Sequence, residues 1–463
     1  MPEPSAPDQW GERLPRRLGF LSAAAVLIGS TIGSGIFRTP AVVAGRIDDL
    51  GLFAAGWVLG GVIALAGALT YGELAAMYPR TGGVYVYIRE AFGRLPAFLF
   101  GWAELLIIRP AAFGAIAITS AEYFWRLAGV DGAALLPGIG LSLAQAVAAV
   151  FIILVAVVNY RGVHLGALVQ NVSTVLKLAA LFALVVLGMV LAPVHELPAA
   201  PAAVPTASLA PAAGFGLAMV SILWAYDGWA DLAFVSGEVR NPQRVLPLAL
   251  FAGTAVVVVS YLFANLVYLH LVPLERMAGS PLIAADAAWR VLGAAGVVFV
   301  SAAVMVSTFG TLNGSMMTGP RIFYAMADDG LFFRPLAAVH PRFGTPAASI
   351  VLAAILGVVF VSIRTFAELA DQFIIGIWPF YALAVAAVVV LRRRRPDAER
   401  PYRVWGYPVT PAVFLIATLY LLGNYAINET RTFAVDVGVV LTGLPVFLYW
   451  TRRSPRRDRQ DGG

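Results

Sequence analysis

Residues 29–37 read GSTIGSGIF, and they lie inside the first long apolar segment of the chain. Gly29, Gly33 and Gly35 fall within seven positions, and Pro40 follows soon after. A glycine inside a helix costs roughly 1 kcal/mol relative to alanine. The stretch therefore predicts a break in the first apolar helix.

A second stretch of this kind, WAYDGWAD at residues 224–231, lies in the sixth apolar segment. A carboxylate at the centre of a bilayer is expensive, so Asp227 also predicts a break there. Unpaired backbone is tolerated at membrane depth only where it is buried in protein or lines a cavity. Two interrupted helices in corresponding halves are typical of a transporter with inverted repeats and a site near the midplane. The alternative is that Gly33 and Gly35 only permit close helix packing.

The composition is that of a membrane protein. Of 463 residues, 60% are hydrophobic and 13% are charged, against about 45–50% and about 25% in soluble domains. These values, with a mean hydropathy of +0.82, exclude a soluble enzyme. A bilayer span needs about 20 apolar residues. By that measure the twelve candidate spans are 18–44, 53–76, 97–125, 139–159, 165–192, 214–236, 246–272, 291–318, 345–363, 372–391, 408–428 and 432–451.

Charge placement adds orientation and one unusual residue. Basic residues concentrate in alternate loops, which favours cytoplasmic termini and an even number of spans. Lys177 is the single lysine among 32 basic residues, and it lies near the middle of the fifth span. A charge at that depth costs at least about 2.5 kcal/mol, so it usually faces a cavity or a partner. The alternative is a side chain that extends to the membrane surface.

Several further stretches carry a family resemblance. They are IGSTIGSGIF at 28–37, YGEL at 71–74, PRTGG at 79–83, WAYDGW at 224–229, EVRNP at 238–242, RIFYAMA at 321–327, DG at 329–330 and GTP at 344–346. On these residues the chain resembles the amino acid–polyamine–organocation superfamily, and within it the branch of L-type amino-acid transporters. The match extends from the first span to beyond the eighth.

The resemblance implies an all-α membrane protein with twelve transmembrane helices, built as a five-plus-five inverted repeat with two further helices. It also implies secondary transport of amino acids by alternating access, without a cofactor or catalytic and metal-binding residues. The expected parts are a cytoplasmic tail at 1–17, a first repeat at 18–192, an external Ala/Pro-rich loop at 193–213, a second repeat at 214–391, the last two spans at 408–451 and a basic cytoplasmic tail at 452–463.

The broken helices are expected to hold the substrate. A zwitterion that leaves water needs both charges satisfied locally, and amide groups at a helix start suit a carboxylate. The resemblance places the carboxylate at Gly33, Ser34 and Gly35. It places the ammonium at the backbone near Thr31 and at the sixth-span residues Trp224 and Asp227.

Alternatives remain for these residues. The Ser34 hydroxyl can instead bond within its own helix. In the family the position of Trp224 is a bulky aromatic over the substrate, and simple packing is the alternative. Asp227 suits a cationic substrate, a proton carrier or a helix cap, and we favour a structural or gating role. Asp231 is expected in the first turn of the second half-helix. Arg109 suits an ion pair as well as a transport role.

In the family, a lysine at the position of Lys177 places its ammonium where sodium-coupled relatives hold sodium. The resemblance implies that this amine bridges the Gly29 carbonyl to the eighth span, where Ser307 is the expected partner. An ammonium is compact, whereas a guanidinium is planar and stays charged. This difference explains why lysine persists at this position in a chain otherwise rich in arginine.

We therefore expect a transporter of neutral L-amino acids, working as a sodium-independent exchanger or a proton-linked carrier in the inner (plasma) membrane. The alternative within the class is an antiporter of cationic amino acids or polyamines. A membrane-embedded enzyme and a channel are remote alternatives, because no paired catalytic groups or continuous polar run stand out. Animal L-type light chains attach to a heavy chain through an external cysteine. This chain has no cysteine, so no disulfide-linked heavy chain is expected, nor any nucleic-acid partner.

Overall fold

The computed structural model describes residues 10–12, 14–136, 138, 140–191, 193–196, 211–280, 282–364 and 366–453. These residues form helices joined by short segments, and the β-pairs among them are two isolated bridges. Most of the expected tail at 1–17, of the loop at 193–213 and of the tail at 452–463 lies outside the described residues.

The elements follow one another as a series of apolar helices, the form in which a chain satisfies its own backbone in hydrocarbon. They are α1 (Phe20–Thr31), α2 (Ser34–Ala44), α3 (Leu50–Met77), α4 (Val84–Phe92), α5 (Arg94–Ala103), the π-helical turn η1 (Glu104–Ile108), α6 (Arg109–Leu127), α7 (Leu143–Tyr160), α8 (Val163–Val190), α9 (Pro211–Tyr226), α10 (Asp231–Phe234), the 3₁₀ turn η2 (Ser236–Glu238), α11 (Pro242–Leu271), α12 (Leu274–Met277), α13 (Ile283–Thr318), α14 (Pro320–Asp328), the 3₁₀ turn η3 (Arg334–Ala337), α15 (Ala347–Ile363), α16 (Phe366–Arg394), α17 (Val409–Asn428), α18 (Thr430–Leu441) and α19 (Gly443–Arg453).

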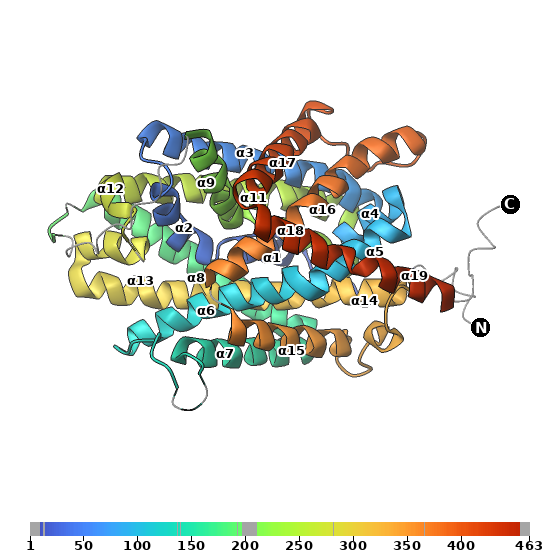
Figure 1. The fold of residues 1–463 in the computed structure, drawn as a ribbon, viewed down its shortest axis with the longest axis horizontal. Coiled ribbons are helices and arrows are strands. Elements are labelled where there is room, and N and C mark those ends of the chain that lie inside the picture. Colours follow the sequence, from blue (N-terminus) through green and yellow to red (C-terminus); the bar gives the residue numbers. More distant parts are fainter. Residues whose placement is uncertain are drawn as a thin grey trace.

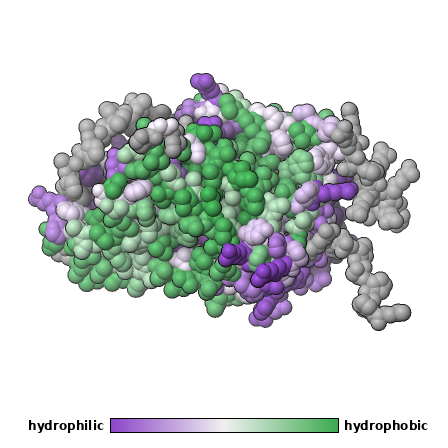
Figure 2. Space-filling view, turned by 90° about the horizontal axis from the view of Figure 1, so that it is seen from below, coloured by the Kyte–Doolittle hydropathy of each residue, from purple (hydrophilic) through white to green (hydrophobic). Residues whose placement is uncertain are grey.

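Ten helical segments among the described residues are long and apolar enough to cross a bilayer, and Ala212–Tyr226 and Ala347–Ile363 are shorter apolar helices. Figure 2 shows hydrophobic side chains across the middle of one face, with hydrophilic ones toward the two ends. Large apolar side chains such as Phe182 and Leu419 are exposed on the helices. The chain is thus a multi-pass membrane protein, and the count of twelve spans stays a prediction.

Some helix boundaries differ from those expected. In the sixth span the helix continues through Trp224 to Tyr226, and only residues 227–230 interrupt it before the short α10. The third span contains the π-helical turn η1, in which the Arg109 N–H bonds the Glu104 carbonyl. This i→i+5 bond brings the two side chains onto one face. The eighth span starts earlier than expected, at Ile283, and kinks at Gly293.

The two helix breaks are in close backbone contact with each other. The first break lies at Ile32 and Gly33, between α1 and α2. Gly228 has φ +118°, and a Cβ there would lie 2.7 Å from the carbonyl carbon of Ser30. A Cβ on Gly35 would lie 2.5 Å from the Ala225 Cα. These glycines are therefore required for close backbone contact between the two broken helices.

Both ends of the described chain meet at one end of the molecule, here called the termini end. The Gly11 N–H donates to the Asp328 carboxylate at 2.7 Å, and the Trp450 ring lies 4.9 Å from that of Phe333. The Leu18 N–H donates to the Glu238 carbonyl at 2.9 Å. Figure 1 shows α14 and α19 at this end and α12 at the opposite one, here called the far end.

Replacing Gly228 with alanine should lower the thermal unfolding midpoint of the purified protein in detergent. Positive φ and the Ser30 contact together imply strain of about 1–3 kcal/mol. Gly423→Ala is the matched control, because Gly423 lies in α17 and an added Cβ would meet nothing within 4 Å. Equal midpoints for the two variants would contradict the close contact between the breaks.

Candidate functional site

A small cavity of about 40 Å³ lies between the two breaks. By volume it has room for about two or three water molecules. All six residues predicted to bind substrate line it, together with side chains from α6, α13 and α16. The lining residues are Ser30, Thr31, Gly33, Ser34, Gly35, Arg109, Ala112, Ile116, Trp224, Asp227, Gly228, Asp231, Thr311, Ser315 and Phe373.

The start of α2 provides amide donors to this cavity. Gly33 is the residue before the helix, and no side chain caps the helix at this position. The first N–H groups of a helix have no acceptor within it, and the helix dipole makes this end positive. Ser34 and Gly35 are both buried. These groups therefore form a site suited to an anion, with little side-chain obstruction.

The Lys177 amine binds the C-terminal end of α1 beside the cavity. Nζ donates to the Gly29 carbonyl at 2.7 Å, to the Ile32 carbonyl at 2.6 Å and to the Thr311 hydroxyl at 3.0 Å. The side chain is 1% exposed. An ammonium has three donors and no acceptor, so three partners satisfy it completely. The positive charge also lies at the negative end of the α1 dipole.

Ser307 is not the side chain that meets this amine. Its hydroxyl donates to the Ile32 carbonyl at 3.1 Å, while Thr311, one turn further along α13, contacts Nζ. Both positions lie on the same helix face, so the sequence spacing did not separate them. The Thr31 carbonyl, expected near a substrate ammonium, already accepts from the Tyr261 hydroxyl at 2.8 Å.

A buried ion network forms the wall of the cavity toward the termini end. Arg109 Nε donates to Glu104 Oε2 at 2.9 Å, and NH1 lies 3.5 Å from Asp231 Oδ1. The Thr318 hydroxyl completes the network by donating to Asp231 Oδ2 at 3.1 Å. Glu104 is 0% exposed and Arg109 is 2% exposed. The network connects α6, α10 and α13, and Asp231 is the first residue of α10.

Asp227 lies beside this network in the interruption of the sixth span. The Tyr381 hydroxyl bonds its carboxylate, and Oδ1 has no hydrogen-bond partner among the described residues. With all groups ionised, three carboxylates (Glu104, Asp227 and Asp231) face one guanidinium. The site therefore lacks positive charge, and an uncompensated buried charge is costly.

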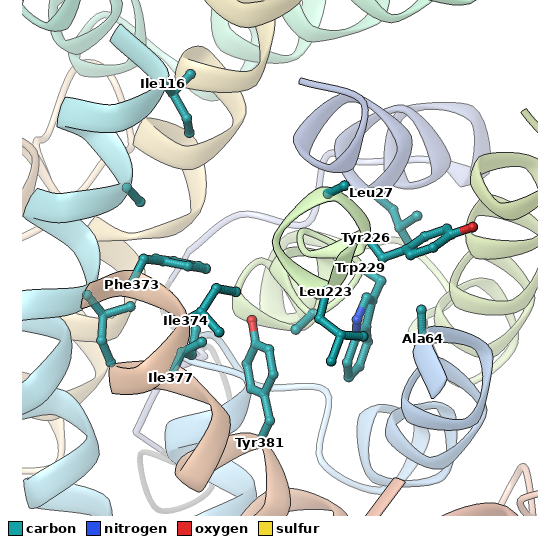
Figure 3. Close-up of a cluster of buried hydrophobic side chains, with 14 of the residues drawn as sticks. Leu27, Ala64, Ile116, Leu223, Tyr226, Trp229, Phe373, Ile374, Ile377 and Tyr381 are labelled. Atoms are coloured by element: carbon teal, nitrogen blue, oxygen red, sulfur yellow. The ribbon is translucent and has the colours of Figure 1, made fainter. Parts of the chain in front are cut away.

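Aromatic rings surround the cavity on the α9 and α16 sides. The Trp224 and Phe373 rings meet edge to face, with centroids 5.2 Å apart. Figure 3 shows Phe373 and Tyr381 on α16 facing Leu223 and Trp229 of the sixth span. The Trp229 and Tyr381 centroids are 5.4 Å apart. These rings limit the space available to the side chain of a ligand.

Glu104, Thr311, Phe373 and Tyr381 are among the residues of the site that were not predicted from the sequence. Glu104, an acid in an apolar span five residues before Arg109, carried a signal that was overlooked. Thr311, Phe373 and Tyr381 carried none, because threonine and aromatic residues are common in apolar helices. The four His residues, His164, His195, His270 and His340, lie at helix ends or in connecting segments.

Replacing Arg109 with methionine should strongly destabilise the protein, because two buried carboxylates lose their cation. Breaking a buried pair typically costs about 3–5 kcal/mol. The added change Glu104→Gln should recover part of the loss in thermal midpoint, because it removes one stranded charge. Arg393→Met, at an exposed arginine, should leave the midpoint unchanged. An Arg109→Met protein as stable as its parent would show that the network does not hold the fold.

Comparison with known proteins identifies the family. The family model described as amino acid permease matches residues 18–447. The chain is 32% identical to the serine/threonine exchanger SteT of Bacillus subtilis (strain 168), covering 95% of this chain and 98% of that protein. It is also 32% identical to the human b(0,+)-type amino acid transporter 1, over 93% and 87% of the two chains. The human cystine/glutamate transporter is 30% identical over 96% and 88%. The chain belongs to the amino acid permease family, and it is a membrane transporter rather than an enzyme.

Proposed function

We propose that this protein exchanges small neutral L-amino acids across the membrane by alternating access, without sodium. The observation that carries the proposal is the opposed chemistry of one cavity. Amide donors of Gly33–Gly35 line one part of it, and the carboxylate-rich group around Asp227 lines another. Two charges of opposite sign at the two ends of one small molecule match this arrangement.

The substrate carboxylate binds at the start of α2. There it accepts hydrogen bonds from backbone N–H groups that have no other acceptor in the helix. Gly33 and Gly35 allow the carboxylate to approach the backbone. Ser34 is buried with them and supplies a hydroxyl beside the same anion site.

The substrate ammonium binds on the other side of the cavity, toward Asp227 and the end of α9. Asp227 Oδ1 has no described partner, and the site has an excess of negative charge that a cation relieves. The Thr31 carbonyl contributes less than expected, because Tyr261 already donates to it. Trp224 lies next to this end and packs against Phe373, and these two rings favour a small side chain over a large one.

Lys177 accounts for transport without sodium. Its ammonium already contacts the Gly29 and Ile32 carbonyls and the Thr311 hydroxyl, which are oxygen ligands of the type that a hard cation needs. A sodium ion at the same oxygens would lie against a positive charge. The lysine thus stabilises the end of α1 permanently, where a coupling ion would do so only when bound.

A second candidate is an exchanger of cationic amino acids, and the unpartnered Asp227 oxygen favours it. In that case the side-chain cation, rather than the α-ammonium, meets Asp227. One named relative is a b(0,+)-type amino acid transporter and another a serine/threonine exchanger. The two candidates differ in which amino acids compete, so a competition assay separates them.

We further propose that both termini are cytoplasmic, in the inner (plasma) membrane, since the basic loops favour this orientation. The chain contains no cysteine. It therefore works without a disulfide-linked subunit, unlike L-type light chains that attach through an external cysteine.

Exchange in proteoliposomes tests the function. Purified protein in liposomes loaded with unlabelled serine should take up labelled serine in sodium-free buffer, and empty liposomes should take up much less. Unlabelled threonine and alanine should compete, whereas lysine and arginine should compete weakly. Strict dependence on sodium would contradict the proposal. Competition by lysine and arginine alone, lost in Asp227→Asn, would establish the second candidate instead.

Lys177→Ala and Lys177→Arg should both reduce exchange more than about tenfold, since each loses charged hydrogen bonds worth about 1.5–3 kcal/mol. Arginine should not restore exchange, because its planar guanidinium does not match three acceptors arranged around one nitrogen. Exchange is measured on protein that elutes as a single species in size-exclusion chromatography. Arg244→Ala, at an exposed arginine, is the control and should exchange like the parent. Normal exchange by Lys177→Ala would refute the role of the amine.

A further inference from the structure

Arg38 is a cation in an apolar helix that the proposed transport chemistry does not use. Its NH1 lies 2.7 Å from Glu122 Oε2, an ion pair in which the side chains are 23% and 36% exposed. Its guanidinium carbon also lies over the Phe366 ring, 4.1 Å from the centroid. One side chain of α2 thus contacts α6 and α16 together.

These three helices are walls of the cavity, and the contacts lie on its far-end side. Arg38 is one turn beyond Ser34, which is about 6 Å along α2. Glu122 lies about 9 Å along α6 beyond the lining residue Ile116, and Phe366 about 10 Å along α16 before Phe373. All three displacements lead away from the Arg109 network. The Arg38 contacts therefore lie between the cavity and the far end.

The helix that carries Arg38 is attached to the broken sixth span. Gly35 packs on Ala225 with no room for a Cβ, and Arg46 NH1 donates to the Ser221 hydroxyl at 2.9 Å. α2 and α9 are thus tied together. The contacts of Arg38 with Glu122 and Phe366 connect this pair of half-helices to α6 and α16 across the cavity.

The exposure of this ion pair distinguishes it from a structural one. In the pair of Arg109 and Glu104 the side chains are 2% and 0% exposed, so their separation would leave a buried charge without a partner. The pair of Arg38 and Glu122 remains accessible to water, so each partner can be solvated when the contact breaks. A partly exposed ion pair and a cation–π contact are individually weak. Such a link is suited to opening and closing repeatedly.

We propose that Arg38 is a gating residue, whose contacts with Glu122 and Phe366 close the cavity toward the far end and break when substrate passes there. This inference rests on the proposed transport function, because it assigns one of the two closures that alternating access requires. It predicts that loss of either contact increases access to the cavity from the far end, in the absence of any substrate.

The absence of cysteine makes the test direct, because one introduced thiol is the only reactive one. Ala112→Cys places a thiol on the cavity wall, and its rate of modification by a small charged methanethiosulfonate is measured on purified protein. Adding Arg38→Met should increase this rate about fivefold, the effect expected of weak contacts. Glu122→Gln should give a similar increase, and the two changes together should give little more.

Two controls separate gating from loosening of the whole protein. Arg126→Met removes an exposed arginine of α6 near the same end and should leave the Ala112→Cys rate unchanged. Ala353→Cys places a thiol at a buried α15 position outside the cavity, and its rate should not respond to Arg38→Met. High salt should raise the Ala112→Cys rate in the parent, since it screens the ion pair, and not in Arg38→Met.

Unchanged modification of Ala112→Cys in both Arg38→Met and Glu122→Gln would overturn the proposal. Equal acceleration at Ala112→Cys and Ala353→Cys would also overturn it, because the effect would then be general. Neither result depends on whether the protein exchanges amino acids. Failure of exchange in liposomes, combined with selective acceleration at Ala112→Cys, would retain the closure and reject the transport function.

Discussion

The bond between the Lys177 ammonium and the open end of α1 is the interaction on which the remaining structure depends. A helix that ends inside hydrocarbon exposes carbonyls that water cannot reach, and each unsatisfied group costs several kcal/mol. The amine satisfies two of them, at Gly29 and Ile32, and places a charge where the dipole is negative. With α1 stabilised in this way, the chain can turn at Gly33 and present the start of α2 to the cavity.

The buried charges divide the site into a fixed part and an open part. Arg109 pairs with Glu104 and approaches Asp231, so the charged groups in that part of the wall already have partners. Asp227, bonded on one side by Tyr381, and the first amides of α2 have no equivalent match. The open groups have opposite sign and belong to different broken helices. A zwitterion that joins them also joins the two helices, which couples occupancy of the cavity to helix position.

The sequence analysis predicted those features whose residue types are unusual in an apolar helix. The glycine-rich break and the isolated Lys177 stand out because glycine and lysine are costly in an apolar helix. Thr311 was missed because Ser307, one turn away on the same face, has the same chemistry, and only the position of the amine along the α13 axis decides between them. Tyr381 and Phe373 come from α16, far along the chain, and no local pattern indicates which of its faces meets the cavity. The π-helical turn accompanies the Glu104–Arg109 pair, and its local signal, an acid five residues before an arginine in an apolar span, was not used.

The two ends of the cavity are closed by contacts of very different character. Toward the far end the closure is an ion pair that water reaches, so separating it leaves both charges solvated. Toward the termini end the wall contains the buried side chains of Arg109, Glu104 and Asp231. If these side chains separate, a buried charge loses its partner unless water or substrate enters at once. The 3.5 Å contact from Arg109 to Asp231 is longer than the 2.9 Å contact to Glu104, which lies on the adjoining turn of the same span. A motion of α10 away from α6 therefore separates Asp231 from Arg109, while Glu104 keeps Arg109 compensated. The uncompensated Asp231 then needs a cation in the cavity, and a bound amino acid carries one.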